Sequence, residues 1–247
     1  MAKKSKKIRH KTGIKKHISK HKPIKKHIPE KKIIIEVKKP VMIEKMPDEK
    51  AFDLIKKYKI PLIQQTFIKN DKDLQLILNK LGFPCVMKVS GNILHRTEVG
   101  GVRVNIQSVQ QATETFKHLM RIKGADKVLI QKQATGKELI VGIKRDSSFG
   151  HIITVGIGGI FVEILKDVIF RVCPISLQDA ENMIRELKGY EILKGMRGER
   201  GIDFNSLYEI LLKVSKLAVN EKIKQMDINP LFCSERGCFA IDVRIIK

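Results

Sequence analysis

The chain has 247 residues, of which 43% are hydrophobic, and carries 49 Lys and Arg against 26 Asp and Glu, a formal net charge of +23. This length and apolar content are typical of a globular protein with a sizeable core. No apolar run approaches the roughly 20 residues of a membrane span, and no apolar segment follows the basic N-terminus as in a secretory signal. We therefore expect a cytoplasmic protein that does not bind membranes.

The positive charge is concentrated at the N-terminus. Residues 1–45 hold 17 Lys and Arg against three Glu, a net charge of +14, together with four of the seven His. Isolated Ile residues cannot offset the entropy of ordering such a segment, so a disordered tail is predicted. The tail is either an arm that binds polyanions, such as nucleic acid, or a solvated extension with no specific partner. Its run KIIIEV, at 32–37, is a candidate strand that docks onto the body.

From residue 46 the pattern becomes that of a mixed α/β domain. Apolar residues recur with helical spacing after Asp48, which is the predicted N-cap, and Gly82 and Ser108 are the predicted end and start of two further helices. In chain order we expect a helix over 46–60, a strand over 61–68, a helix over 70–82, strands over 83–89 and 101–106, a helix over 108–122 and a strand over 127–134.

The second half of the body continues with strands before helices. In chain order we expect strands over 138–145 and 151–157, a glycine loop with extended structure over 156–175, helices over 176–190 and 203–220, and two strands within 224–246 joined by a turn at 234–237. This mixture of strand–helix steps and consecutive hairpins favours α+β lobes over one doubly wound parallel sheet.

A phosphate-handling loop is predicted after the strand at 83–89. Lys88 supplies a point charge at the end of this strand, and the glycines that follow let backbone N–H groups approach an anion. The loop also carries His95, whose imidazole is neutral near pH 7 and can form a labile P–N bond. Glu98 is a candidate to orient this ring. The alternative for His95 is a purely structural role. The glycine patterns of P-loop enzymes and of dinucleotide-binding proteins are absent from the sequence.

A magnesium site is predicted near the C-terminus. Asp227 and Asn229 are two residues apart on an extended segment, so their side chains share one face. Asp242 lies on the next strand, which a hairpin would bring alongside, and Pro230 is expected to prevent the first strand from being central. Such oxygen ligands suit Mg²⁺ together with nucleotide phosphates and water. The alternative for each residue is a solvated position at a strand edge.

The four cysteines form no C-x-x-C pair. In a chain expected to be cytoplasmic, such cysteines are predicted to be reduced thiols, and they argue against a zinc site.

Four stretches of the body, taken together, resemble a known family. They are residues 83–106, 136–176, 184–198 and 226–244, and they resemble the ATP-grasp subunit of the NDP-forming acyl-CoA synthetases, most of all the beta subunit of archaeal ADP-forming acetyl-CoA synthetase. The resemblance covers about residues 46–247 and leaves the tail outside. Where family members usually read Ser-Pro-Asp, this chain has Ser90, Gly91 and Asn92, and glycine in place of proline is expected to loosen the loop.

The resemblance implies a two-lobed α+β ATP-grasp fold that holds ATP or ADP between its lobes. The small N-terminal lobe would span 46–125 and the C-terminal lobe 126–247. The implied site comprises His95 and Glu138 as catalytic residues, Lys88, Gly100 and Gly101 as nucleotide-binding residues, and Asn229, Asp242 and Asp227 as Mg²⁺ ligands.

The implied reaction is acyl-CoA + ADP + phosphate ⇌ carboxylate + CoA + ATP, with His95 as a phosphoryl relay. The resemblance also implies a partner, the CoA-binding alpha subunit, which would carry a second phosphohistidine. The acyl group is not legible in this chain. Two alternatives stay open: another ATP-grasp carboxylate ligase that forms an acyl phosphate directly, without need for His95, and a nucleic-acid-binding protein on an ATP-grasp body.

Overall fold

The structure, a computed structural model, describes residues 45–93, 96–159, 167–196 and 198–247. His95 and the predicted tail up to residue 44, with its candidate strand, lie outside these described residues. Within the described ranges, no helix combines the length and the hydropathy that crossing a membrane requires. The described body is built on two antiparallel sheets, each with its own buried core.

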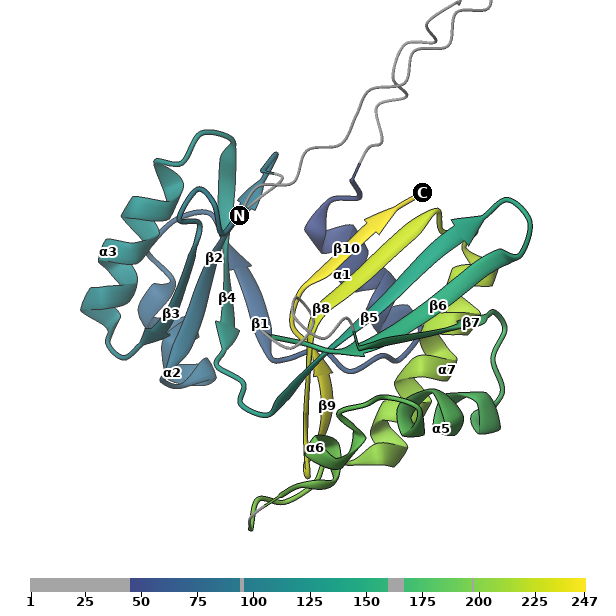
Figure 1. Ribbon diagram of the computed structural model, residues 1–247. Helices are drawn as coiled ribbons and strands as arrows, with labels where there is room; N and C mark the ends of the chain where they lie inside the picture. Colours follow the sequence, from purple (N-terminus) through teal and green to yellow (C-terminus); the bar gives the residue numbers. More distant parts are fainter. Residues whose placement is uncertain (1–44, 94–95, 160–166, 197) are drawn as a thin grey trace, which may run out of the picture. The chain divides into compact units, whose positions relative to one another are not determined.

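The first sheet has four strands in the order β1, β4, β2, β3 (Figure 1). Its strands are Gln65–Ile68 (β1), Cys85–Gly91 (β2), Val102–Ile106 (β3) and Ala125–Lys132 (β4). Two helices, Leu74–Leu81 (α2) and Val109–Met120 (α3), pack against this sheet. Their apolar faces bury Leu78 and Leu119 completely, beside Met87 of β2, so helices and sheet share one core.

Two of the predicted helix boundaries are confirmed by local geometry. Ser108 caps α3, because its side chain accepts a hydrogen bond from the backbone N–H of Gln111 at 3.2 Å. Gly82 ends α2 with a φ of 79°, a conformation that glycine adopts without steric cost. Both boundaries depend on one residue and its nearest neighbours, which is why the sequence predicts them.

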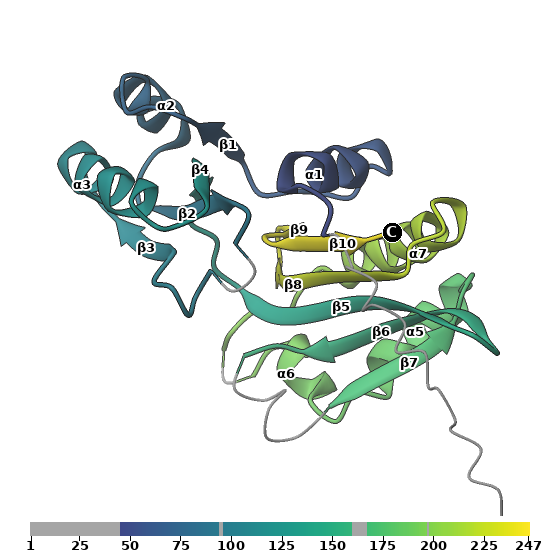
Figure 2. The same ribbon diagram turned by 90° about the horizontal axis from the view of Figure 1, so that it is seen from above.

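The second sheet runs in the order β10, β8, β5, β6, β7, with β9 paired to β8. Its strands are Lys137–Asp146 (β5), Gly150–Ile157 (β6), Val168–Val172 (β7), Gln225–Ser234 (β8), Gly237–Ala240 (β9) and Val243–Ile246 (β10). The helices of this part are Leu177–Arg185 (α5), Tyr190–Lys194 (α6) and Phe204–Asn220 (α7), of which α5 and α7 pack against the sheet (Figure 2).

Membership of the two cores does not follow chain order. The helix Asp48–Lys57 (α1) precedes the whole first sheet, yet its residues Phe52 and Ile55 are buried in the core of the second sheet. Residues 125–132 form β4 and pair with β2 in the first sheet, so the chain changes sheet after β4. The predicted division of the body into lobes at 46–125 and 126–247 stays a prediction.

The C-terminal segment was predicted to form two strands, the first of which Pro230 would keep out of the centre of the sheet. The structure differs on both points. Instead β8 continues through Pro230 and lies between β5 and β10, while the returning chain is divided into β9 and β10. The register between β8 and β5 shifts between Leu139 and Val141, opposite Asn229 and Pro230. This irregularity removes the need for an N–H at Pro230, so the proline is compatible with a central strand and the prediction was wrong.

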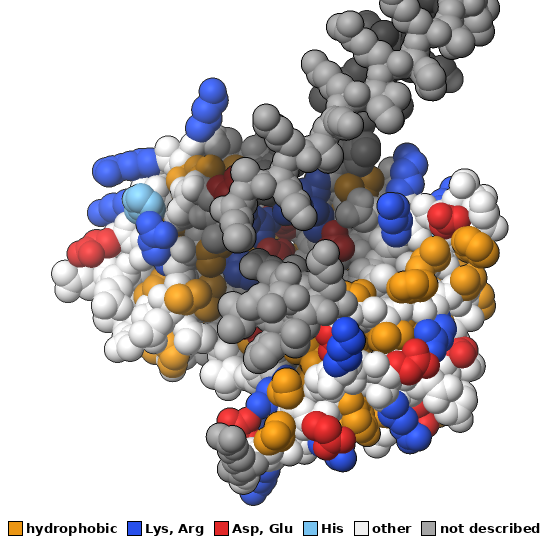
Figure 3. Space-filling view, in the orientation of Figure 1, with side chains coloured by type: hydrophobic (Ala, Val, Ile, Leu, Met, Phe, Trp, Pro, Cys, Tyr) orange, Lys and Arg blue, Asp and Glu red, His pale blue; other side chains and the backbone are white. Residues whose placement is uncertain are grey.

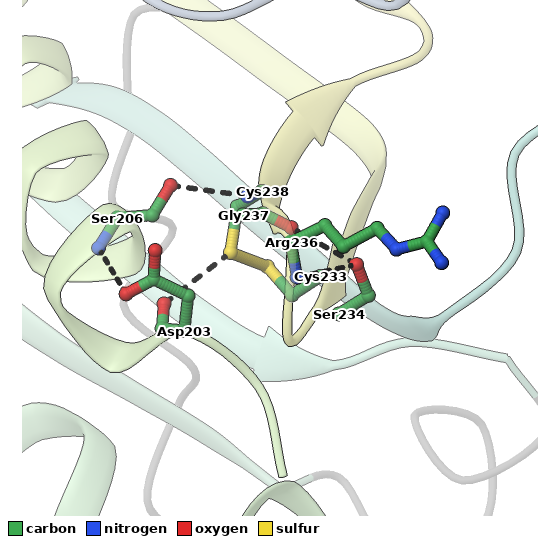
Figure 4. The surroundings of a disulfide bond; sticks show 7 residues. All are labelled: Asp203, Ser206, Cys233, Ser234, Arg236, Gly237 and Cys238. Carbon is green, nitrogen blue, oxygen red and sulfur yellow. Dashed lines mark hydrogen bonds between the residues drawn. A yellow bond between two sulfur atoms is a disulfide. The ribbon is translucent and has the colours of Figure 1, made fainter. Parts of the chain in front are cut away.

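The prediction of four reduced cysteines is confirmed for Cys85 and Cys173, which are free, and was wrong for the other two. Cys233 and Cys238 form a disulfide across the β8–β9 hairpin, with Cα atoms 4.1 Å apart (Figure 4). The hairpin register places the two residues directly opposite each other, which sequence spacing alone does not reveal. The backbone N–H of Cys238 donates to Ser206 Oγ at 3.0 Å, and the backbone N–H of Ser206 donates to Asp203 at 3.1 Å, so the hairpin is tied to the start of α7 (Figure 4).

Candidate functional site

A polar cavity of about 540 Å³ is lined by residues from both sheets. It brings together the predicted site residues Lys88, Asp227, Asn229 and Asp242, and with them Glu98, the candidate to orient His95. The other lining residues are Lys45, Arg96, Thr97, Val102, Pro230 and Arg244. Figure 3 shows Lys and Arg side chains next to Asp and Glu side chains in the hollow of the face seen in Figure 1.

The acidic side of the cavity comes from β8 and the break between β9 and β10. The backbone N–H of Asn229 donates to the carbonyl oxygen of Asp242 at 3.1 Å, so these two residues are held side by side. Asp227 lies opposite Gly142 of β5. A Cβ atom at that glycine would lie 2.6 Å from Thr154 Oγ1, which is too close, and 3.5 Å from Asp227 Oδ1, which is ordinary contact, so a side chain would displace the Thr154 hydroxyl.

The donor set on this side fits a magnesium ion that also binds a nucleotide. Among the described residues, no group of three or more His, Cys, Asp or Glu side chains could hold a metal ion. Asp227 and Asp242 supply two carboxylates, and Asn229 adds an amide oxygen. Mg²⁺ commonly takes one or two protein carboxylates and completes its shell with phosphates and water, which matches this incomplete set.

Lys88 lies on the opposite side of the cavity, in the middle of the first sheet. Its strand β2 is flanked by β3 and β4, where Val102 and Leu129 are its neighbours, and the residue is 7% exposed. Burial holds the pKa of the Lys88 ammonium group below its usual value; the charges of Asp242 and Asp48 oppose this shift, and the charge of Arg96 adds to it. A poorly hydrated cation in a polar cavity is a strong anchor for a phosphate group.

Asp48 has a role that the sequence did not predict. Pro47 occupies the N-cap position of α1, and Asp48 is a buried residue of the first helical turn, so its prediction as N-cap was wrong. Its carboxylate accepts hydrogen bonds from Ser90 Oγ at 2.7 Å, from Lys45 Nζ at 2.8 Å and from Arg96 Nη2. Burial raises the pKa of the Asp48 carboxyl, but the charge of Arg96 and the bonds from Lys45 and Ser90 hold the pKa below its usual range.

Arg96 is the second functional residue that the sequence analysis missed. Its side chain is 7% exposed and lines the cavity, with Nη2 on Asp48 and Nη1 3.5 Å from Asp242 Oδ1. Aspartate is common in the first turn of any helix, and one arginine does not stand out in a chain with 49 Lys and Arg residues. Neither residue type therefore signals the pair, which joins positions 48 residues apart.

The loop glycines form a turn and do not line the cavity. The backbone N–H of Gly100 donates to the carbonyl oxygen of Thr97 at 3.1 Å, and that of Gly101 donates to the carbonyl oxygen of Arg96 at 2.7 Å. A Cβ atom at Gly101 would lie 2.5 Å from Val89, so the position requires glycine. The assignment of Gly100 and Gly101 to nucleotide binding stays a prediction, and their hydrogen bonds argue for a role in shaping the loop.

Gly91 permits a close backbone contact at the start of the loop. Its φ is 146°, and a Cβ atom there would lie 2.1 Å from the carbonyl oxygen of Gly124. The same oxygen accepts a hydrogen bond from the backbone N–H of Asn92 at 3.1 Å. The absence of the proline that is usual in the family at this position predicted a looser loop, and it did not predict that the fold requires glycine here.

Glu138 lies outside the lining of the cavity. It is an exposed residue of β5, opposite Phe232 of β8, and its backbone oxygen accepts a hydrogen bond from the N–H of Gly158 at 2.6 Å. A Cβ atom at Gly159 would lie 3.6 Å from its carboxylate. Its catalytic role stays a prediction, as does that of His95, which lies outside the described residues.

Comparison with known proteins identifies relatives over almost the whole described body. A family model for the ATP-grasp domain matches residues 43–246. The beta subunit of the ADP-forming acetate–CoA ligase I of Pyrococcus furiosus is 40% identical over 209 residues, which cover 81% of this chain and 90% of that subunit. The ADP-forming acetate–CoA ligase II of Archaeoglobus fulgidus is 42% identical over 195 residues, or 78% of this chain, but this chain spans 29% of that longer protein.

Solved structures of an acetyl-coenzyme A synthetase 1 from Candidatus Korarchaeum cryptofilum have a similar fold. A complex with coenzyme A and Ca-AMPCP superposes with a TM-score of 0.77 at 33% sequence identity, covering 82% of this chain and 93% of that one. A complex of the same protein with coenzyme A and Mg-AMPPCP has a TM-score of 0.72 at 33% identity, covering 82% and 92%, and its phosphohistidine segment points towards the nucleotide binding site.

Proposed function

The chain belongs to the ATP-grasp family, and on this premise we propose that it is the nucleotide-binding subunit of an ADP-forming acyl-CoA synthetase. The family match confirms the predicted fold class, and the relatives are ADP-forming acid–CoA ligases, the enzyme class predicted from the sequence. The acyl-CoA activity, its substrates and its partner are proposals for this chain.

One observation carries the proposal. A single cavity is lined by the buried cation of Lys88 on one side and by Asp227, Asn229 and Asp242 on the other. A nucleoside diphosphate or triphosphate needs such a pairing, because its phosphates require cations and its bound metal requires oxygen ligands. We assign Lys88 to the phosphates and the three oxygen-bearing side chains to Mg²⁺. When bound, the ion supplies neutralisation of phosphate charge, and the protein side chains orient the nucleotide for transfer.

His95 is the proposed phosphoryl relay. In the direction that consumes ATP, an imidazole nitrogen attacks the γ-phosphorus, a P–N bond forms, the P–O bond to ADP breaks and ADP leaves. The reverse step makes ATP. One observation supports this assignment: Arg96, the next residue in sequence, lines the cavity. Imidazole suits the role because it is a neutral nucleophile near pH 7.

The proposed partner is a CoA-binding subunit. The match covers 90% of the separate beta subunit of the P. furiosus enzyme and 29% of the longer A. fulgidus ligase. By this comparison, a second polypeptide would supply the CoA site, the acyl site and a further phosphohistidine. The complete reaction would then convert acyl-CoA, ADP and phosphate into carboxylate, CoA and ATP.

The experiment begins with calorimetric titration of ADP and ATP into the full chain, with and without Mg²⁺. Mg²⁺-dependent binding is expected. The chain is then incubated with ATP labelled in its γ-phosphate, and a protein-bound label that is lost in acid and kept in base is expected in the wild type and absent in His95→Asn. The exposed residue His118 of α3 offers the matched control, His118→Asn, which should label normally.

The outcomes separate the two parts of the proposal. Absence of nucleotide binding by the wild type overturns the nucleotide-binding role. Normal nucleotide binding with undiminished labelling of His95→Asn overturns the relay and favours a ligase that forms an acyl phosphate directly. The rate of phosphoryl transfer in the assembled enzyme should fall by orders of magnitude in His95→Asn, as is usual when a nucleophile is removed.

A further inference from the structure

A buried ionic network joins the first turn of α1 to the loop that follows β2. The Asp48 side chain is 3% exposed and receives hydrogen bonds from Ser90, Lys45 and Arg96. Ser90 precedes the segment that contains His95, and Arg96 follows it. One carboxylate therefore holds both the end of β2, at Ser90, and Arg96 of the loop, on either side of the proposed relay residue.

Stability alone is a poor explanation for this network. Removing an Asp and an Arg from water costs several kcal/mol per ion, and well-packed apolar residues in such places are often equally stable. Helix capping is also no explanation, because Pro47 occupies the N-cap of α1 and the hydrogen bonds of the Asp48 carboxylate come from Ser90, Lys45 and Arg96. What the network does provide is a fixed position for the guanidinium group of Arg96.

The two ends of that guanidinium group have different environments. Nη2 contacts the Asp48 carboxylate in the protein interior. Nη1 lies 3.5 Å from Asp242, at the outer limit of a hydrogen bond, and the side chain of Asp242 is 37% exposed. One end is therefore held tightly and the other lies in the cavity, next to a residue that we assign to Mg²⁺.

We propose that Arg96 binds a phosphate group of the nucleotide and that Asp48 is the positioning residue that holds its guanidinium in the cavity. The inference rests on the proposed function and deepens it. Nη2 keeps its bond to Asp48, while Nη1 exchanges its long contact with Asp242 for a phosphate oxygen. The exchange leaves the Asp242 carboxylate to the cation that accompanies the nucleotide.

The chemistry of arginine suits this position. Its planar group presents five N–H donors in a rigid fork, so one edge can bind a carboxylate while the other binds phosphate. A charge-assisted hydrogen bond from a guanidinium that is already oriented loses little entropy on binding. Without Asp48, the same guanidinium would be free to turn towards Asp242 and compete with the cation.

The test measures affinities for ADP and adenosine by calorimetry in the presence of Mg²⁺. Arg96→Gln is expected to weaken ADP binding about tenfold and to leave adenosine binding unchanged, since a charge-assisted bond to phosphate is worth roughly this factor. Asp48→Asn should reproduce this selective loss, and Asp48→Glu should recover much of the ADP affinity. The matched control is Asp53→Asn on the same helix, where the side chain is 75% exposed.

A double-mutant cycle distinguishes positioning from general stability. If Asp48 acts through Arg96, then the double variant Asp48→Asn/Arg96→Gln binds ADP no more weakly than Arg96→Gln alone. Additive losses, an equal loss of adenosine affinity, or a lowered melting temperature with unchanged ADP affinity would each overturn the inference. If Asp48→Asn does not fold, Ser90→Ala replaces it, with a smaller selective loss of about twofold to fivefold expected.

Failure of this inference can be told apart from failure of the proposed function. If the wild type binds no ADP, the proposed function fails and this inference fails with it. If the wild type binds ADP with Mg²⁺ and Arg96→Gln binds it equally well, only this inference fails.

Discussion

The two sides of the cavity differ in charge, in burial and in how they are held. The β2 side presents Lys88 and Arg96, both 7% exposed, and Asp48 behind them balances part of their charge. The β8–β10 side presents Asp227 and Asp242, which are partly exposed. Buried cations are therefore organised by the fold itself, whereas the carboxylates remain accessible to a cation that arrives with a ligand. The comparison predicts that removal of the buried Lys88 cation has the largest effect.

The largest effect is expected for Lys88→Met. The change removes a buried cation for which water cannot substitute, so ADP affinity should fall about a hundredfold in calorimetry. The control is Lys117→Met, at an exposed position of α3, the helix that packs against the sheet containing Lys88. Equal ADP affinity in Lys88→Met and wild type would remove the assignment of this residue to phosphate.

A smaller effect is expected on the acidic side. Asp242→Asn and Asn229→Ala should each weaken Mg²⁺-dependent ADP binding about tenfold, because each change removes or weakens one of several oxygen ligands. Titrations with and without Mg²⁺ isolate this effect. Asp126→Asn, with a side chain 58% exposed outside the cavity, is the control. Loss of affinity in the absence of Mg²⁺ would show that these residues contact the nucleotide and not the ion.

Glu221, whose carboxylate lies outside the cavity, is expected to make the stability of the fold depend on pH in the acid range. Glu221 accepts hydrogen bonds from Lys57 at 2.8 Å and from Lys247 at 3.0 Å, and these bonds lower its pKa to about 2. Because the folded-state pKa lies below the unfolded value, the stabilisation is present above about pH 4.5 and is lost as the pH falls towards 2. Chemical denaturation of wild type and Glu221→Gln across this range should show a shallower decline for the variant. Parallel curves would contradict the assignment.

The smallest effect on the cavity is expected from removal of the tail. A chain that begins at residue 41 should keep its melting temperature and its ADP affinity, because none of the site residues predicted from the sequence lies in that segment. Its binding to RNA or DNA, measured against salt concentration, should fall sharply relative to the full chain, since the tail carries most of the net charge. A drop in melting temperature would instead identify 32–37 as a docked strand.

Local pattern was enough to predict much of this protein. The helix start at Ser108 and the helix end at Gly82 follow from neighbouring residues. Lys88, Asp227, Asn229 and Asp242 could be selected because a lysine before a glycine loop and paired oxygen ligands on one strand face are recognisable within a few residues. These signals are short in range, so the sequence carries them without knowledge of the fold.

Tertiary structure alone decided the partners of Asp48, Arg96 and Cys233. Asp48 has the spacing of a helix cap, and only the approach of a loop 48 residues away makes it the counterion of Arg96. The disulfide and the central position of Pro230 depend in the same way on strand register, which the β8–β9 hairpin and the irregular pairing of β8 with β5 determine. Periodicity and capping are properties of consecutive residues, whereas ion pairs, disulfides and register are set by which distant surfaces meet when the core forms.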